Sequence, residues 1–552
     1  MACIFKYLPF CASLALLSAC QKNNVATFDN FVYEGNDDVY VGVNADSAFC
    51  NPILAGYYPD PSICKKGDTY YIVNSSFSHF PSIPIFKSTD LVNWEQLGYV
   101  INDVNALSFD SLQVSEGIFA PTIRYNPHND TFYVITTCVQ CGGNFIVKSK
   151  DPDGGVWSDP IWIPEVGGID PSLFFDDDGQ AYIVNNDAPQ CEPRYEGHRT
   201  IWMHRYDTAT DRVIGNAWVV VDGGIHPEEN PIWIEGPHMY KLDGKYIIMA
   251  AEGGTSINHS EVVLISDSPE GKYTPAPINP ILTQRDMPAD RANPVTCTGH
   301  ADLVQDGNGD YWAVFLGCRP YPEGYYNTGR EIFLLPVQIV NGQPIILEQG
   351  KDVPLIMTQK PVTYRPMKTE TCEPFSGNFS WTDDFSATEL SKRYIFVRNV
   401  RNKWYNTENG KLNMTFEGSK LDSICNPHFI AFRQQHLKCS ASVDVEMNTE
   451  CDGKFAGMAA FQNDRCFVAI GMTNKELIVY TVINGEKQII ASQPLMAKNL
   501  RLSISADNEM YTLKAMNGNE VVMSEELSGT FLSTDKAGGF VGTIIGMLAQ
   551  EY

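Results

Sequence analysis

The sequence predicts an all-β protein, in which a five-bladed β-propeller is followed by an antiparallel β-sandwich of the jelly-roll or concanavalin-like kind. Two observations support this prediction: a hairpin that recurs five times in the first two-thirds of the chain, and evenly spaced strand-like segments in the last third. Helical periodicity is weak in the repeat region, so an α/β fold is a poor alternative. The 552 residues are too many for one hydrophobic core, and two large domains or three small ones are expected.

The recurring hairpin is a Gly or Asp turn followed by aromatic and β-branched residues. It occurs at residues 67–73, 130–135, 179–184, 244–248 and 309–314. Eleven or twelve residues before each hairpin aromatic lies a short polar or turn-like motif, at residues 59–62, 120–122, 170–172, 235–238 and 299–302. Because the offset is constant, the motifs are expected at one place in five four-stranded blades, whose first strands surround a common axis. Unrelated strands of a β-sandwich, which are the alternative, have no reason to keep this offset.

The predicted propeller covers residues 38–348, a connector follows at residues 349–380, and the predicted sandwich covers residues 381–552. The connector contains Pro, Thr and Lys with little pattern. In the sandwich, strand-like segments follow one another at roughly ten-residue spacing with turn signals between them. These segments are residues 436–447, 455–460, 465–472, 476–483 and 500–504.

The N-terminus has the pattern of a signal peptide, which is predicted at residues 1–19. Lys6 precedes an apolar run at residues 7–17, and this run is too short to cross a bilayer. The following Leu-Ser-Ala-Cys resembles a bacterial lipobox, which implies that Cys20 is acylated; an ordinary signal peptide with a chance cysteine is the alternative. The protein is therefore predicted to be exported and held at a bacterial membrane only by its lipid. Residues 21–24 lack an acidic run, which favours a periplasm-facing anchor over the cell surface.

Charge restricts the class of partner. The formal net charge of −26 argues against a nucleic-acid partner, because phosphate binding requires a basic surface. A neutral polysaccharide is compatible with this charge. The protein is expected to be a monomer.

Twelve cysteines follow Cys20, and in an exported protein some of them can pair. Five lie inside strand-like runs, where a buried free thiol is the preferred interpretation for most of them. They are Cys138, Cys297, Cys318, Cys439 and Cys466. Cys138 and Cys141 form a CxxC motif, but no second CxxC accompanies it, so a zinc site is not predicted.

Three of the five blade motifs carry an acid: Asp60, Asp170 and Glu235. Acids gathered on one axis are costly, because like charges repel and burial opposes ionisation. Hydrolysis of a glycosidic bond needs such a set: one carboxylic acid protonates the departing oxygen, and one carboxylate activates water or attacks carbon. A third acid can keep the pKa of the first one high. Asp-Pro is also a turn initiator, but that alternative does not explain three acids in register.

The motifs that carry these acids resemble glycoside hydrolase family 43, the β-xylosidases and α-L-arabinofuranosidases. The resemblance rests on the ordered strings YYPDPS, FAPTIRY, GIDPSLFFDDDG, IEGPHMYKLDGKYI, AEGGT, TGHADLV, WAVFLG and NTGRE, and it covers roughly residues 50 to 350. The sandwich resembles the C-terminal module of one large branch of the family. In that branch the module packs against the propeller and lends a side chain to the pocket rim, so the glycine-rich segment 538–546 is expected to approach the site.

The resemblance implies inversion at the anomeric carbon by direct attack of water. Asp60 is then the general base and Glu235 the general acid, while Asp170 tunes the pKa of Glu235 and orients it. Arg330 in NTGRE is expected to reach into the sugar pocket. His300 in TGHADLV is expected to support the site, in some members through a bound ion or water; a plain core histidine is the alternative. No cofactor is expected to be required, and a structural calcium is left open, with His300 as the candidate ligand.

Departures from the xylosidase pattern bear on the substrate. His79 stands before Phe80 and Pro81 where xylosidases of this branch tend to have Trp, Ser82 replaces a Gly, and Phe119 replaces a Trp. These positions are expected to wall the pocket, and their side chains favour terminal α-L-arabinofuranose over β-D-xylose. The prediction is an exo-acting enzyme that trims hemicellulose side chains or oligosaccharides; the parent polysaccharide is left open between arabinoxylan, xyloglucan and arabinan.

Two other functions remain open. A β-D-xylosidase, or an enzyme that acts on both sugars, is the nearer alternative, because the two sugars place their reacting atoms similarly. A non-catalytic carbohydrate-binding lipoprotein is the remote alternative. A binding protein has no reason to keep all three acids.

Overall fold

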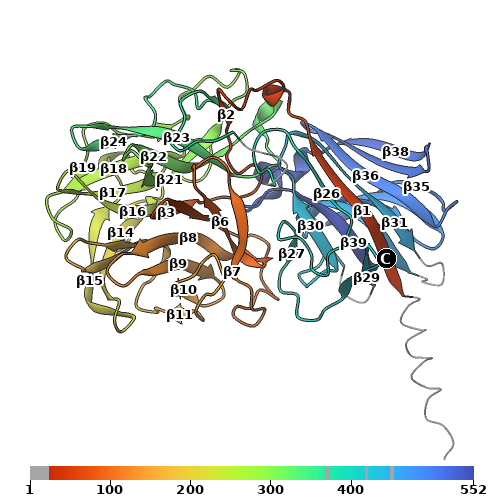
Figure 1. The fold of residues 1–552 in the computed structure, drawn as a ribbon, viewed down its shortest axis with the longest axis horizontal. Helices are drawn as coiled ribbons and strands as arrows, with labels where there is room; N and C mark the ends of the chain where they lie inside the picture. The colour runs from red at the N-terminus through yellow and green to blue at the C-terminus, as the bar shows by residue number, and fades with distance from the viewer. Residues whose placement is uncertain (1–23, 367–372, 417–419, 448–452) are drawn as a thin grey trace, which may run out of the picture.

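The computed structural model describes residues 24–366, 373–416, 420–447 and 453–552. These residues form a five-bladed β-propeller and a β-sandwich that lie side by side (Figure 1). The predicted fold class is therefore confirmed. The predicted signal peptide and Cys20 lie outside the described residues. No helix in the described part of the chain is long and apolar enough to cross a membrane.

Each blade is an antiparallel sheet whose strands follow chain order from the axis outward. The first is β3 (Ser62–Lys66), β4 (Thr69–Val73), β6 (Ser82–Ser88) and β7 (Glu95–Ile101). The second is β8 (Gly117–Asn126), β9 (Thr131–Val139), β10 (Gly143–Ser149) and β11 (Ile161–Trp162). The third is β12 (Ile169–Phe175), β13 (Ala181–Asp187), β14 (Thr200–Asp207) and β15 (Arg212–Asp222).

The fourth blade is β16 (Glu235–Leu242), β17 (Lys245–Glu252), β18 (Ser260–Ser266) and β19 (Thr274–Pro275), with β20 (Leu282–Thr283) also pairing with β18. The fifth is β21 (Thr296–Gln305), β22 (Tyr311–Cys318), β23 (Glu331–Val340) and β24 (Gln343–Ile345). The five first strands adjoin one another in a closed ring, from β3 through β8, β12 and β16 to β21 and back to β3. The repeated aromatic hairpins enter the second strand of each blade, so the constant offset in the sequence reflects a constant place in the blades.

The sandwich has an outer sheet and an inner sheet. The outer sheet runs β28 (Tyr405–Glu408), β29 (Lys411–Thr415), β1 (Val25–Gly35), β31 (Lys438–Met447), β36 (Asn499–Asp507), β37 (Met510–Asn517) and β38 (Glu520–Ser528), and β26 (Ser380–Asp383) pairs with β1. The inner sheet runs β35 (Glu486–Pro494), β34 (Glu476–Ile483), β33 (Cys466–Met472), β32 (Lys454–Asn463), β39 (Ile544–Glu551), β30 (Phe429–Arg433), β27 (Ile395–Val397) and β5 (His79–Phe80).

The remaining elements are short. They are the pair β2 (Phe49–Cys50) and β25 (Ile356–Met357), the 3-10 turns η1 (Asp38–Tyr40), η2 (Pro227–Glu229), η3 (Pro322–Gly324) and η4 (Thr530–Leu532), and the helix α2 (Thr534–Ala537).

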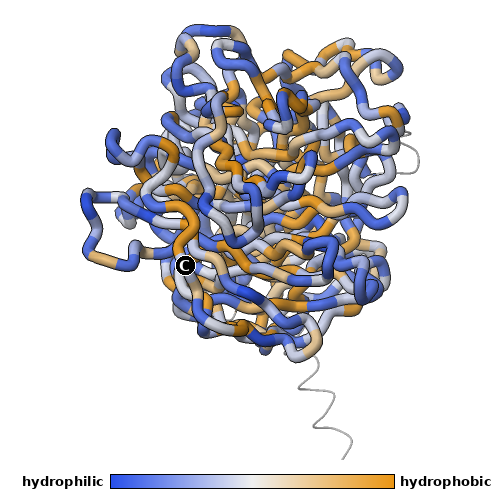
Figure 2. The backbone as a smooth tube through the Cα atoms, turned by 90° about the vertical axis from the view of Figure 1, so that its left-hand side faces the viewer, coloured by the Kyte–Doolittle hydropathy of each residue, from blue (hydrophilic) through white to orange (hydrophobic). Residues whose placement is uncertain are grey.

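Burial along the strands shows how the layers stack. β31 alternates between buried and partly exposed residues, as expected for a sheet with one face in water. β32 and β33 are buried on both faces. Along β32, Ala456 and Met458 pack into the core between the two sheets, whereas Phe455 and Phe461 pack into a second core with Tyr57 of the propeller. The inner sheet is therefore the middle layer of the molecule, and hydrophilic stretches lie mainly in the outer loops (Figure 2).

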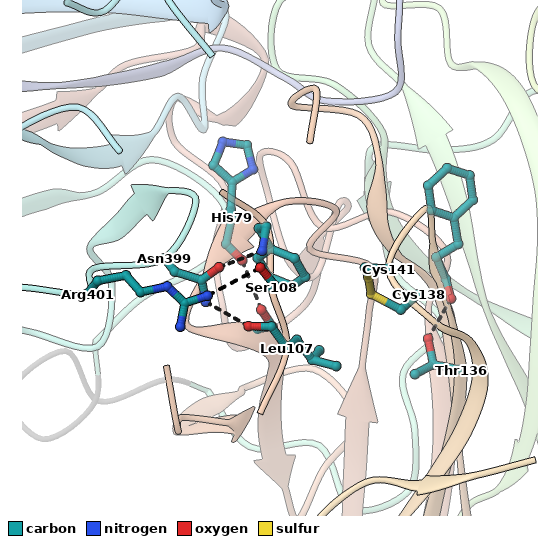
Figure 3. Close-up of a disulfide and its surroundings, with 11 residues drawn as sticks. His79, Leu107, Ser108, Thr136, Cys138, Cys141, Asn399 and Arg401 are labelled. Carbon is teal, nitrogen blue, oxygen red and sulfur yellow. Dashed lines mark hydrogen bonds between the residues drawn. A yellow bond between two sulfur atoms is a disulfide. The ribbon is translucent and has the colours of Figure 1, made fainter. Parts of the chain in front are cut away.

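Two strands of the sandwich come from unexpected parts of the chain. β1 precedes the propeller in sequence but pairs with β29 and β31, and β5 lies within the predicted propeller range but pairs with β27. The two domains therefore share strands. Figure 3 shows a further link, in which Asn399 and Arg401 after β27 hydrogen-bond to Leu107 and Ser108 of the propeller.

The cysteines follow the expectation with one correction. Cys138 is not a free thiol: it is joined to Cys141, because the turn after β9 brings the two Cα atoms to 5.2 Å, within the usual range for a disulfide (Figure 3). Cys297, Cys318, Cys439 and Cys466 are free and buried.

A buried ion cluster joins the domains at Arg319. Its guanidinium donates to both carboxylate oxygens of Glu331, at 2.7 and 2.9 Å, and to Asp37 at 2.6 Å. It also donates to the carbonyl oxygen of Gln435 at 2.9 Å, in the segment after β30. All of these groups are buried, so the carboxylates depend on Arg319 for their charge partner.

Replacing Arg319 by Met should therefore destabilise the protein by about 3–5 kcal/mol, because it leaves two buried carboxylates without a cation. Urea unfolding followed by tryptophan fluorescence measures the change. Arg205→Gln, which breaks a half-exposed pair with Glu270, is the control and should leave the midpoint unchanged. Equal midpoints for the two variants would contradict the role given to Arg319.

Candidate active site

A left-handed residue stands at the same place on every blade, where the first strand begins at the mouth of the propeller. These residues are Asp60 (φ 54°), Ala120 (φ 35°), Asp170 (φ 55°), Gly236 (φ 54°) and His300 (φ 51°). In the second to fifth blades the strand pairing skips residues at this point, which marks a β-bulge. Left-handed conformations cost free energy for residues with a Cβ, and such strain concentrates at functional sites. The bulges bring the ends of the five first strands together around the axis.

Glu235 departs from the predicted register by one residue. The residue equivalent to Asp60 and Asp170 is Gly236, and Glu235 occupies the position held by Phe119 in the second blade. The reason is steric: a Cβ on Gly236 would lie 2.8 Å from the His300 ring, so only glycine fits at this bulge. The acid side chain is therefore supplied by the preceding residue.

Asp60 is held ionised. Its Oδ1 accepts a hydrogen bond from Arg330 at 2.8 Å, its Oδ2 accepts one from Ser75 at 2.6 Å, and His300 Nδ1 lies 3.7 Å away. Burial on its own would raise the pKa of Asp60, but the charge of Arg330, then His300 and the Ser75 hydroxyl, outweigh burial and hold the pKa below its ordinary value.

Glu235 is in the opposite condition. Burial raises its pKa well above the ordinary value, and the negative charges of Asp170 and Asp60 raise it further, against the smaller effects of Arg330 and Arg199. Asp170 accepts a hydrogen bond at 3.0 Å from the backbone N–H of Gly236, the residue next to Glu235. Burial also raises the pKa of Asp170. The environment therefore shifts the two pKa values in opposite directions, downward at Asp60 and upward at Glu235.

Aromatic rings surround Arg330. Its guanidinium lies 5.9 Å from the centre of the Phe77 ring and 5.6 Å from that of Phe540. Phe119 meets both rings edge to face, at 5.1 and 5.8 Å. Phe540 belongs to the sandwich, in the segment before β39, so the predicted side chain contributed by segment 538–546 is Phe540. Close contact makes this possible, because a Cβ on Gly329 would lie 2.9 Å from the Cα of Gly542.

A polar layer lies behind the carboxylates, two to four residues further along the first strands. Its centre is Asp302, which accepts hydrogen bonds from Arg124 at 2.7 and 3.0 Å and from Ser62 at 2.7 Å. Arg124 also reaches His238 Nδ1 at 3.0 Å, and burial lowers the pKa of His238 to about 3, so that this ring is neutral. The layer fixes the inner strands to one another beneath the site.

The predicted pocket residues His79 and Phe80 lie at the junction of the two domains. His79 is 1% exposed and Phe80 is 8% exposed, and both belong to β5, the edge strand of the inner sheet. His79 Nδ1 meets the Tyr57 hydroxyl at 3.0 Å. Among the described residues, no hydrogen bond, ion pair or ring contact joins His79 or Phe80 to the three acids. The structure brings together Asp60, Asp170, Glu235, Arg330 and His300, with Phe119 beside Arg330, and places the His79–Phe80 pair at the domain junction.

The site residues that sequence analysis missed are Ser75, Phe77 and Arg124. Ser75 and Phe77 follow β4 and carry no motif of their own, so only the fold reveals them. Arg124 lies in the string FAPTIRY and was readable as a buried charge four residues after the bulge at Ala120.

A metal site was left open at His300. No group of three or more His, Cys, Asp or Glu side chains in the described ranges is arranged to hold a metal ion. A structural calcium therefore stays a prediction of the sequence.

Comparison with known proteins agrees with this geometry. Residues 49–344 match the family described as glycosyl hydrolases family 43, and residues 382–552 match the beta xylosidase C-terminal concanavalin A-like domain. A xylosidase/arabinosidase of Butyrivibrio fibrisolvens is 36% identical over 518 residues, which are 91% of this chain and 95% of the relative. A non-reducing end alpha-L-arabinofuranosidase of Bacteroides ovatus is 32% identical over 528 residues, 92% of each chain. The crystal structure of a GH43_12 protein retrieved from capybara gut metagenome superposes with a TM-score of 0.89 at 39% identity, covering 96% of this chain and all of that one.

Replacing Asp170 by Asn should move the basic limb of the pH–rate profile to lower pH. The negative charge of Asp170 raises the pKa of Glu235, so its removal lets Glu235 lose its proton at lower pH. The pH dependence of kcat/KM measures this. Asp178→Asn, on an exposed turn of the third blade, is the control; a basic limb that stays in place in Asp170→Asn would contradict the coupling.

Proposed function

The chain belongs to the glycosyl hydrolases of family 43, and we propose that it is an exo-acting, inverting enzyme that releases terminal non-reducing α-L-arabinofuranose from hemicellulose side chains or oligosaccharides. The observation that carries this proposal is the opposite shift of two pKa values at the mouth of the propeller, lowered at Asp60 and raised at Glu235. One enzyme needs an ionised and a protonated carboxyl at the same pH, and a binding site needs neither.

The proposed reaction uses each group once. Glu235 donates its proton to the glycosidic oxygen, which leaves as the hydroxyl of the shortened substrate. Asp60 accepts a proton from a water molecule, whose oxygen bonds to the anomeric carbon from the opposite side of the sugar and inverts its configuration. Asp170 keeps Glu235 protonated until the bond breaks, and Arg330 keeps Asp60 ionised.

Sugar identity is the finer part of the proposal. Phe119, Phe77 and Phe540 form the aromatic wall at Arg330, and the departure at Phe119 from the xylosidase pattern favours arabinofuranose. The name of the relative from Bacteroides ovatus supports the same choice. The relative from Butyrivibrio fibrisolvens carries both sugars in its name, and it keeps β-xylosidase or dual activity as the second candidate.

The mode of action and the location are also proposals. Phe540 packs against Phe77 and Phe119 from the sandwich side, and a pocket closed in this way would accept only a terminal sugar. We propose that acylation of Cys20 holds the exported protein at a bacterial membrane on its periplasmic side, and that it acts there as a monomer on small oligosaccharides. Shaving of intact cells with protease tests the location, because complete loss of the protein would place it on the cell surface.

Comparison of nitrophenyl α-L-arabinofuranoside with nitrophenyl β-D-xyloside tests the function. We expect a higher kcat/KM for the arabinofuranoside, and proton NMR at early times should detect the inverted anomer. A higher kcat/KM for the xyloside would establish the second candidate, a retained anomer would overturn the mechanism, and no turnover of either compound would overturn the enzymatic function.

Glu235→Gln should lower kcat/KM for an oligosaccharide by at least about 10²-fold, the usual scale for acid catalysis. The loss should be smaller for a nitrophenyl glycoside, because nitrophenolate leaves without a proton. Asp60→Asn should lower kcat/KM for the oligosaccharide and for the nitrophenyl glycoside alike, because it removes the base that activates water. Glu228→Gln, an exposed acid in η2, is the matched control; near-native turnover by a folded Glu235→Gln variant would sink the assignment.

A further inference from the structure

An exposed tryptophan stands beside the proposed acid. Trp233 lies two residues before Glu235, just before β16, and is 37% exposed, and its neighbour Ile232 is 51% exposed. Trp233 has φ 50°, a conformation that a bulky residue adopts only where its surroundings impose it. The backbone N–H of Trp233 donates to the carbonyl of Gly197 at 3.0 Å, which holds the segment in place. The backbone at Trp233 is thus held in place, and the side chain is partly open to solvent.

Arg199 covers part of this indole. The centre of its guanidinium lies 4.6 Å from the centre of the Trp233 ring, the distance of a cation–π contact. Two of its nitrogens, Nε and one Nη, donate to Asn186 Oδ1 at 3.0 and 2.8 Å. Asn186 in turn donates to the carbonyl of Ile234, between Trp233 and Glu235. Asn186 therefore links the Arg199 guanidinium to the strand that carries Glu235 and holds it beside the Trp233 ring.

The guanidinium keeps unused donors. In the part of the chain that the structure describes, its hydrogen-bond acceptor is Asn186 alone, which leaves further N–H groups of Arg199 available. The charge of Arg199 also reaches Glu235, where it opposes the effects of burial and of Asp170 on the pKa. A flat apolar ring next to free, fixed donors is a surface suited to a sugar, which has apolar C–H faces and hydroxyl edges.

The chemistry of the reaction indicates which sugar of the substrate would bind at Trp233 and Arg199. The general acid must touch the oxygen that joins the two sugars, so the leaving group lies on the Glu235 side of the site and the terminal sugar on the Asp60 side. We infer that Trp233 and Arg199 form the subsite for the leaving-group sugar, with the ring stacked on the indole and its hydroxyls bonded to the guanidinium. This inference rests on the proposed function and adds the specificity for the chain that carries the terminal sugar.

Binding in a Glu235→Gln background tests the inference without turnover. Calorimetry compares arabinofuranosyl-substituted xylotriose with methyl α-L-arabinofuranoside, and xylobiose with methyl β-D-xyloside; each methyl glycoside fills only the terminal-sugar site. One of the two oligosaccharides is expected to bind. Adding Trp233→Ala should lower the affinity for that oligosaccharide by about tenfold, which corresponds to about 1.4 kcal/mol, and leave the affinity for the matching methyl glycoside unchanged. Arg199→Met should act in the same direction, and it provides a second variant if Trp233→Ala does not fold.

Trp162→Ala is the matched control, because Trp162 is 41% exposed but lies on β11, the outermost strand of the second blade. The inference would be overturned if Trp162→Ala lowered the affinity for the oligosaccharide equally, or if a subsite variant lowered the affinity for both ligands of a pair equally. It would also be overturned if neither subsite variant lowered the affinity, or if no oligosaccharide bound. Turnover by the wild-type protein separates the two proposals. If the wild-type protein hydrolyses the substrate but Trp233→Ala has no effect on binding, the subsite is contradicted and the enzymatic function stands. If binding depends on Trp233 but no hydrolysis occurs, the enzymatic function is contradicted and the binding subsite stands.

Discussion

The buried ion pair between Arg319 and Glu331 is the contact on which the site depends. Glu331 is fully buried and also accepts a hydrogen bond from the backbone N–H of Gly56 at 2.6 Å, in the segment that leads to Asp60. Its chain neighbour Arg330 makes the ion pair with Asp60. One carboxylate thus fixes both segments whose charges meet in the site. Because Arg319 also binds the sandwich, the position of Arg330 depends on the packing of the two domains.

Environment, more than residue type, separates the two acids. Asp60 and Glu235 are buried to a similar degree, at 6% and 8% exposed, so burial alone would push both pKa values upward. Arg330 and Ser75 bond directly to Asp60 and lower its pKa. Among the charges that act on the pKa of Glu235, the like charge of Asp170 has the largest effect, and it raises that pKa. The propeller makes this separation possible because neighbouring blades supply a cation to one acid and an anion to the other.

Local pattern was enough to predict the blades and to place the three acids near the start of their first strands, because each motif is a short repeated segment with its own turn chemistry. The exact register of Glu235 was not predictable, since it depends on the His300 ring that lies against Gly236, 64 residues away along the chain. β1 and β5 were missed for the same kind of reason: alternation identifies a strand but not its partner. His79 and Phe80 were assigned to the pocket on resemblance, and their pairing with β27 could not be read from the sequence.

The course of the chain through the sandwich has a consequence for how the protein reaches its native state. Tyr33 in β1 bonds to His436, 403 residues later, and the last strand, β39, lies in the middle of the inner sheet between β30 and β32. β1 therefore has no partner strand until β26, β29 and β31 exist, and the inner sheet between the domains closes only when β39 is present. Contacts of such long sequence separation form slowly. Assembly of the sandwich consequently depends on segments that are far apart in the chain, and its sheets have open edges until those segments pair.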